Sequence, residues 1–125
     1  MKSILTIAAI SGLLAVALGA FGAHGLKSII TPEMLDVYKT GVQYQFYHTF
    51  ALLAVGILMN FNQSKALKWS ATLFVIGMIL FSGSLYVLAI SGVKALGMIT
   101  PFGGITWIAA WFLLIVHCRK LSTSK

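Results

Sequence analysis

The sequence predicts an all-α fold, a four-helix transmembrane bundle that forms a single domain over residues 1–125. Only 9% of the residues are charged, 59% are hydrophobic and the mean hydropathy is +0.97, values that ordinary soluble domains do not reach. Four stretches lack Asp, Glu, Lys and Arg, and each can supply the roughly 20 residues that one helical span needs. We therefore expect spans at about residues 4–26, 41–62, 68–91 and 101–118.

The net charge of +7 is spread over the ends of the expected spans and does not form the concentrated basic face that nucleic-acid binding requires. One side of the membrane carries Lys2, Lys65, Lys68, Arg119, Lys120 and Lys125. The other side carries Lys27, Lys39 and Lys94 together with both acids, Glu33 and Asp36. The excess of cations on the first side predicts that both termini are cytoplasmic. The lone Cys118 excludes an intrachain disulfide or a Cys-x-x-Cys redox pair.

The first span has small residues along one face. On a helix, one stripe collects Ala8, Ser11, Gly12, Ala15, Gly19, Gly22 and Ala23. Such a stripe lets helix backbones approach closely inside a membrane, so we expect this span at the centre of the bundle. We also expect it to be retained rather than cleaved as a signal peptide, because the apolar run continues to Leu26.

A helix start follows at Thr31-Pro32, with Thr31 as the N-cap and Glu33 and Asp36 in the first turns. It predicts a short acidic amphipathic helix outside the membrane, to about Lys39, that runs into the second span with at most a bend at Gly41. Thr100-Pro101 repeats this start before the last span, and a parallel internal repeat is one interpretation.

The last two spans add further packing signals. Gly77, Ser84 and Ser91 recur every seven residues and predict a helix-packing seam. Trp107 and Trp111 align with Gly104 on one face, which favours lipid contact or packing between helices over a cofactor site. We expect His117, beside two cations, to be an interfacial residue.

The outer halves of the spans gather an unusual number of polar groups at similar depth. They are His24, Gln43, Tyr44, Gln45, Tyr47, His48, Ser82, Ser84 and Tyr86. Within a membrane such groups must find partners, and ionisable ones are candidates for function. Three interpretations stay open: hydrogen bonds that join the helices, a ligand pocket open to the outside, and a metal or haem site. The last needs His24 and His48 at equal depth, which the sequence leaves undecided.

Enzymatic and transport motifs find no support. No acid lies within an expected span, which argues against catalytic triads and against proton-coupled exporters of similar size. The glycines lie inside the spans, so no phosphate-binding loop is expected. We therefore expect a protein that is not an enzyme and has no metal.

Four motifs in order carry a family resemblance. They are Gly19-Ala20-Phe21-Gly22-Ala23-His24-Gly25-Leu26, Thr40-Gly41-Val42-Gln43-Tyr44-Gln45 with Tyr47-His48, Phe81-Ser82-Gly83-Ser84-Leu85-Tyr86, and Thr100-Pro101-Phe102-Gly103-Gly104. Over nearly its whole length the chain resembles domain-of-unknown-function family 423, small bacterial membrane proteins similar to the eukaryotic transmembrane protein 256 group. The resemblance implies a four-span protein of the bacterial plasma (inner) membrane and supplies no activity.

The leading functional hypothesis is a non-enzymatic membrane protein that binds a small ligand, a lipid or a partner helix through the outer polar cluster around His48. Two alternatives are a small oligomeric channel or transporter subunit and a haem- or quinone-linked redox protein that uses His24 and His48. A structural factor of a larger complex, or a homo-oligomer, fits the same sequence. The bilayer itself is the one partner common to all of these.

Overall fold

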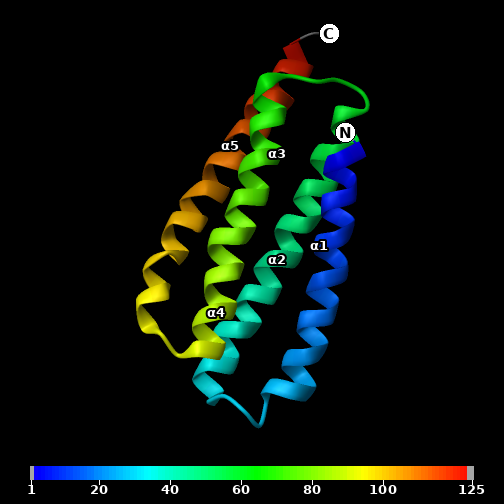
Figure 1. Cartoon of the computed structure of the whole chain (residues 1–125). Helices are drawn as coiled ribbons and strands as arrows, with labels where there is room; N and C mark the ends of the chain where they lie inside the picture. The colour runs from blue at the N-terminus through cyan, green and yellow to red at the C-terminus, as the bar shows by residue number, and fades with distance from the viewer. Residues whose placement is uncertain (1, 124–125) are drawn as a thin grey trace.

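The computed structural model describes residues 2–123, which form four long helical rods (Figure 1). The first rod is α1 (Lys2–Phe21), which continues into the π-helical turn η1 (Gly22–Leu26). The second is α2 (Pro32–Met59). The third consists of α3 (Lys65–Gly77), the π-helical turn η2 (Met78–Gly83) and α4 (Ser84–Ser91). The fourth, α5 (Thr100–Thr123), follows the short 3₁₀ turn η3 (Lys94–Met98). The all-α prediction is confirmed.

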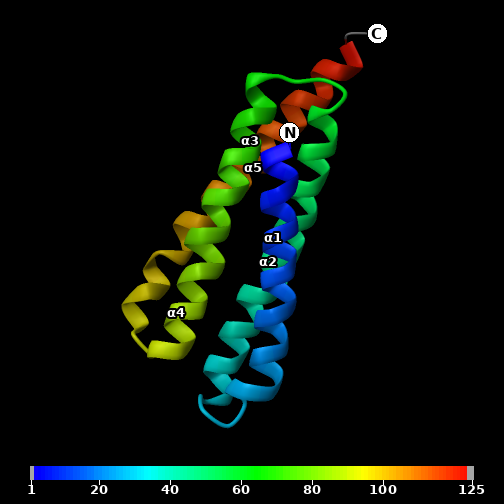
Figure 2. The ribbon, with the colours of Figure 1, turned by 45° about the vertical axis from the view of Figure 1, so that its right-hand side comes forward.

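Successive rods run in opposite directions along the bundle (Figures 1 and 2). The start of α1, the end of α2, the start of α3 and the end of α5 lie together at one end, which we call the terminal end. The turn η1, the start of α2, α4 and η3 lie at the other, which we call the loop end. The two ends of the described chain are therefore on the same side.

The helix starts follow from local capping chemistry. The Thr31 hydroxyl accepts a hydrogen bond from the backbone N–H of Met34 at 3.1 Å, so the cap predicted at Thr31-Pro32 is confirmed. Ser64 caps α3 in the same way. At the repeated Thr-Pro, however, the Thr100 hydroxyl lies 2.6 Å from the Ser84 hydroxyl and joins α5 to α4. This Thr100 contact gives the internal repeat no support.

The short outer amphipathic helix does not form as a separate element. α2 runs without interruption for 28 residues from Pro32 to Met59, and residues 32–39 are its first turns. One glycine in a helix costs only about 1 kcal/mol, and Gly41 is buried against Tyr86, where there is little room for a side chain. The helix therefore passes through Gly41 and ends at Met59, three residues before the expected end of the second span.

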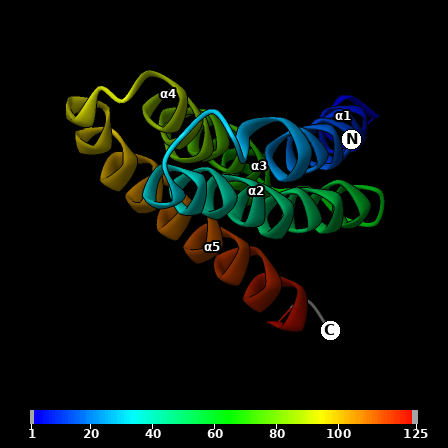
Figure 3. The ribbon, with the colours of Figure 1, turned by 90° about the horizontal axis from the view of Figure 1, so that it is seen from below.

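α2 occupies the centre of the bundle, and the expectation that the first span lies there is wrong. α2 packs against α1 on one side and against α3, η2 and α4 on the other, while α5 packs mainly on α3 and η2 (Figure 3). The small-residue face of α1 packs mainly against α2, and Ser11 also contacts Met78 of the third rod. Most of the rest of α1 is exposed, with Leu13 at 68% and Val16 at 62%. A single stripe of small residues lets one neighbouring helix approach closely, whereas a central helix must pack against several helices.

The core consists of two apolar clusters. The larger lies in the terminal half, where Leu52, Val55, Leu67 and Phe74 are fully buried and Trp107 closes the cluster from α5. The smaller lies at the loop end and is formed by Leu26, Tyr38 and Ala89. The polar residues of α2 lie between the two clusters.

Three of the described helices are long and apolar enough to cross a membrane: Lys2–Leu26, Lys65–Ser91 and Lys94–Lys120. α2 is as long as these, but its middle part carries Gln43, Gln45 and His48, which lower its hydropathy. The central helix is thus the most polar of the four rods, and its buried face packs against α1 and the third rod.

Candidate functional site

A chain of buried hydrogen bonds joins three rods at mid-height. The Tyr86 hydroxyl donates to Gln45 Oε1, and Gln45 Nε2 donates to the Ser11 carbonyl at 2.9 Å and lies 3.2 Å from the Ser11 hydroxyl. The Ser11 hydroxyl lies 2.7 Å from that of Thr49, and both lie near the Met78 sulfur. We call these five residues the polar chain. Its amide hydrogens and hydroxyl groups satisfy one another without a ligand.

The period of α2 explains why these groups meet. Gly41, Gln45 and Thr49 are four residues apart and share one helix face. On that face, the Ser82 hydroxyl of η2 donates to the carbonyl of Gly41 at 2.7 Å. The face therefore bonds to α1 on one side and to the third rod on the other, at about 0.6 kcal/mol per interhelical hydrogen bond on average.

His48 lies on a different face of α2, against α5. Its ring is parallel to the indole of Trp107, with centroids 3.6 Å apart and planes 2° apart. The His48 Nδ1 lies 2.8 Å from the Tyr44 carbonyl, and the Trp111 indole N–H donates to His48 Nε2 at 3.2 Å. Since a carbonyl only accepts and an indole N–H only donates, these contacts assign a neutral imidazole with its proton on Nδ1. Both ring nitrogens are thus occupied within the chain.

The structure divides the predicted polar cluster into four parts. Gln45 lies on the face of α2 that contacts α1 and the third rod, and Ser82 and Tyr86 of the third rod bond to this face. His48 instead faces α5. Ser84 pairs with Thr100 between α4 and α5. A fourth group lies at the surface: Gln43 and Tyr47 bond to each other there, and Tyr44 is 38% exposed beside Trp107.

His24 is not brought to the cluster. It is exposed in η1, near the loop end. His48 lies at the level of Ser11, because Gln45 and Thr49 on either side of it both bond to Ser11. The 13 residues from Ser11 to His24 correspond to about 20 Å along a helix. The two histidines therefore lie at different depths along the bundle. The sequence alone did not decide whether their depths were equal.

Several contributors were not among the predicted site residues. Ser11 was assigned only to the small-residue stripe, Thr49 ends the polar stretch of α2, and Met78 has no polar signal at all. Trp107 was recognised as one of two aligned tryptophans, for which packing between helices was one alternative. A hydroxyl on an otherwise apolar face is the signal that points to Ser11 and Thr49.

The six residues expected in helix packing lie as follows. Ala15 is fully buried against α2, and Gly12 and Gly19 face the side chains of Thr49 and Val42. Gly22 faces the ring of Tyr38, and Gly77 faces the indole of Trp107, with no room for a side chain at either. Ala23 is exposed. The glycines thus mark the close approaches of α1 to α2 and of α3 to α5.

An apolar groove opens beside the polar chain, between α1 and the third rod. It has a volume of about 180 Å³ and is lined by Ile7, Ile10, Ser11, Leu14, Gln45, Val75, Met78 and Ile79. Ser11 and Gln45 form its polar part, and their hydrogen-bonding groups are already engaged in the polar chain. A guest in this groove therefore meets branched apolar walls and few free polar atoms.

His117 is buried at the terminal end, where an interfacial position was expected. Only 2% of it is exposed, and its Nδ1 lies 2.7 Å from the Ser64 hydroxyl, which caps α3. Its Nε2 is buried and has no hydrogen-bond partner among the described residues. His117 thus ties α5 to the start of α3, while Cys118 beside it is exposed.

The long apolar helices, their exposed apolar faces and the polar groups enclosed between them define a helical integral membrane protein. Residues 18–104 match the family described as "Protein of unknown function (DUF423)". The chain belongs to this family, as its four motifs predicted.

Relatives extend the match to nearly the whole chain. The UPF0382 membrane protein SAB0533 of Staphylococcus aureus is 41% identical over 98% of this chain and 99% of its own. The UPF0382 membrane protein YwdK of Bacillus subtilis is 43% identical over 96% and 98%. The UPF0382 inner membrane protein YgdD of Escherichia coli K12 is 41% identical over 96% and 92%. No solved structure gives a significant match to this chain.

Proposed function

We propose that this protein crosses the bacterial plasma membrane four times, with both termini in the cytoplasm, and that it is a non-enzymatic protein that binds an apolar guest in the groove beside the polar chain. The guest is a lipid, a small apolar ligand or a side chain of a partner helix. The outer polar cluster of the sequence serves this function indirectly, because it holds the walls of the groove together.

The topology has support from length and charge. Residues 40–59 of α2 lack Asp, Glu, Lys and Arg, and the helix runs antiparallel to α1 along the bundle. Among the described residues, Lys2, Lys65, Lys68, Arg119 and Lys120 are exposed at the terminal end. By the positive-inside rule, this excess of cations supports the proposal that the terminal end is cytoplasmic.

The observation that carries the proposal is an apolar groove whose polar groups are already satisfied. An unoccupied donor or acceptor would favour a polar ligand, since buried polar groups need partners. In the groove, the Gln45 amide nitrogen donates to the carbonyl and the hydroxyl of Ser11, and the Gln45 amide oxygen accepts a hydrogen bond from Tyr86. The branched side chains of Ile10, Leu14 and Ile79 supply the contact surface instead.

No comparable observation favours the channel or redox alternatives. A channel needs polar groups that line a water-filled path, and here they bond to one another between helices. A haem held by His24 and His48 needs a free nitrogen on each ring and equal depth. Both nitrogens of His48 have partners within the chain, and the two residues lie at different levels.

Native mass spectrometry tests the proposal. The protein is purified in mild detergent, and we expect a hydrophobic molecule to be retained. Leu14→Trp, at a site that is 47% exposed, fills the groove and should abolish retention while thermal stability is kept. Ile108→Trp, on the outer face of α5 where it is 71% exposed, is the matched control and should retain the molecule. Wild-type protein that carries nothing, or equal retention in both variants, would refute the proposal.

A further inference from the structure

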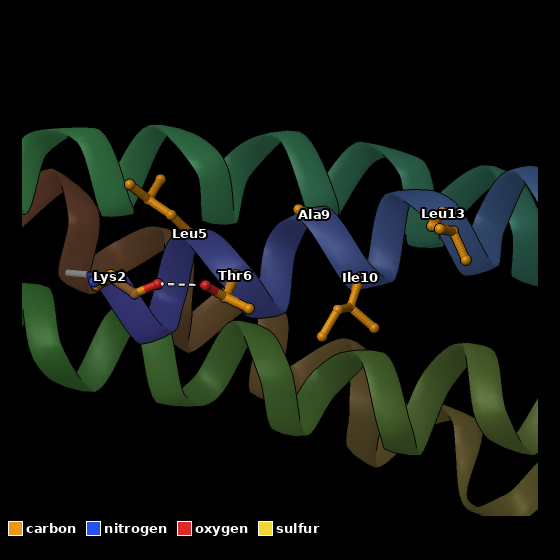
Figure 4. Close-up of a pocket in the computed structure, with 6 residues that line it drawn as sticks. All are labelled: Lys2, Leu5, Thr6, Ala9, Ile10 and Leu13. Carbon is orange, nitrogen blue, oxygen red and sulfur yellow. Dashed lines mark hydrogen bonds between the residues drawn. The ribbon is translucent and has the colours of Figure 1, made fainter.

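The groove has a neighbouring hollow on α1, which reaches the terminal end at Lys2. A second, open depression of about 420 Å³ is lined by Lys2, Leu5, Thr6, Ala9, Ile10 and Leu13. Ile10 lines both the groove and this depression, and Figure 4 shows its side chain pointing from α1 toward the neighbouring α3. The two hollows therefore meet at Ile10, and a cation is among the residues that line the far end.

The length of this path matches one leaflet of a bilayer. Lys2 and Leu14 are 12 residues apart on α1, which corresponds to about 18 Å at 1.5 Å per residue. Half of a hydrocarbon core of about 30 Å is about 15 Å. A chain that begins beside Lys2 thus reaches the middle of the membrane at the part of the groove that Ser11 and Gln45 line.

The size of the groove decides which guest fits. One water takes about 30 Å³ of liquid volume, so about 180 Å³ holds roughly six groups of that size. A helix is about 10–12 Å across and does not enter such a space. A polar molecule finds the polar groups of Ser11 and Gln45 already engaged. An unbranched hydrocarbon chain is narrow enough for this volume and needs no hydrogen-bonding partner.

From this geometry we infer that the groove and the neighbouring hollow together hold one acyl chain of an anionic phospholipid from the leaflet at the terminal end, with its headgroup beside Lys2. The inference rests on the proposed function and names its guest. Within a bilayer no hydrophobic effect favours one apolar neighbour over another, so the acyl chain is held by close packing. The preference for an anionic headgroup comes from the lysine, because a cation near the surface attracts anionic lipids.

The test uses the full-length protein reconstituted in vesicles of equal parts phosphatidylglycerol and phosphatidylcholine, followed by mild release and native mass spectrometry. We expect one retained phosphatidylglycerol per chain. Lys2→Gln should lower the preference for phosphatidylglycerol over phosphatidylcholine by about fivefold, the effect of one lysine near an anionic surface. Lys68→Gln, an exposed lysine at the same end that lines neither hollow, is the control and should leave the preference unchanged.

Groove-filling variants separate this inference from the proposed function. Ile10→Trp and Leu14→Trp alter exposed side chains, at 53% and 47%, and each should reduce lipid retention at least tenfold. Retention that depends on the groove without preference for phosphatidylglycerol, or that ignores Lys2→Gln, overturns the lipid assignment and leaves the proposed function standing. A dimer without lipid that Leu14→Trp disrupts also overturns it, in favour of a partner helix. Wild-type protein without any guest overturns both.

Discussion

The imidazole of His48 and the indole of Trp107 lie face to face, with ring centroids 3.6 Å apart and planes within 2°. This stack joins the central helix α2 to the peripheral helix α5, which has few other contacts with α2. A second bond, from the Trp111 indole to His48 Nε2, strengthens the same joint. His48, which the sequence places at the centre of the predicted ligand cluster, thus contacts α5 through both its ring face and its Nε2.

His48→Ala should destabilise the protein by about 2–4 kcal/mol, because it leaves a cavity beside Trp107 and removes the acceptor of Trp111. Thermal or denaturant unfolding in detergent, followed by near-UV circular dichroism, measures the loss. His24→Ala is the matched control, since His24 is exposed, and should change stability by less than about 0.5 kcal/mol. Equal effects of the two substitutions would show that His48 does not serve as the joint.

A pair of glycines tests the close approach of α3 to α5. Gly77→Ala places a methyl group in the indole ring of Trp107 and should cost about 1–3 kcal/mol through overpacking. Gly104→Ala, on α5, has open space around the added carbon and should stabilise the helix by about 0.5–1 kcal/mol. Unfolding free energies of the two variants should therefore have opposite signs. A neutral Gly77→Ala would contradict the packing described here.

The polar chain predicts energetic coupling between Gln45 and Tyr86. Gln45→Leu leaves the Tyr86 hydroxyl without its acceptor and should cost about 1–3 kcal/mol. Tyr86→Phe should cost less in a Gln45→Leu background, with a coupling energy of about 0.6 kcal/mol and at most about 1.7 kcal/mol. A double-mutant cycle measures this coupling energy. Gln43→Leu, at the exposed surface of α2, serves as the uncoupled control.

Tyr38, in the first turns of α2 outside the expected span, predicts a loss of stability at alkaline pH. Burial raises the pKa of its hydroxyl, which donates to the Leu18 carbonyl at 2.6 Å. A group whose pKa is raised on folding contributes fully below its unfolded value of about 10 and loses that contribution as pH rises through the folded value. Unfolding midpoints should therefore fall above about pH 10. Tyr38→Phe should weaken this fall, and a variant that titrates like the wild type would contradict it.

Local chemistry was sufficient for much of the architecture. The Thr31 cap, the run of helices and their membrane character follow from capping residues and uncharged stretches, each of which acts within one helix. The family followed from four short motifs. Helix caps, uncharged stretches and short motifs each depend on residues that are close in sequence, so they can be recognised from the sequence alone.

The arrangement of the polar residues depended on rotation and order of the helices, which the chain does not display. Gln45 and His48 are three residues apart, yet one faces α1 and the other faces α5. Placing them required knowing that α2, and not α1, is central. A helix with one small-residue stripe, such as α1, packs closely on one neighbour, whereas α2 has polar or small residues on two faces and can be bonded from both. The sequence by itself therefore determined the helices, their membrane setting and the family, because these are properties of single segments. Only the tertiary structure decided which polar groups meet and that a groove lies beside them, because both depend on how separate segments pack.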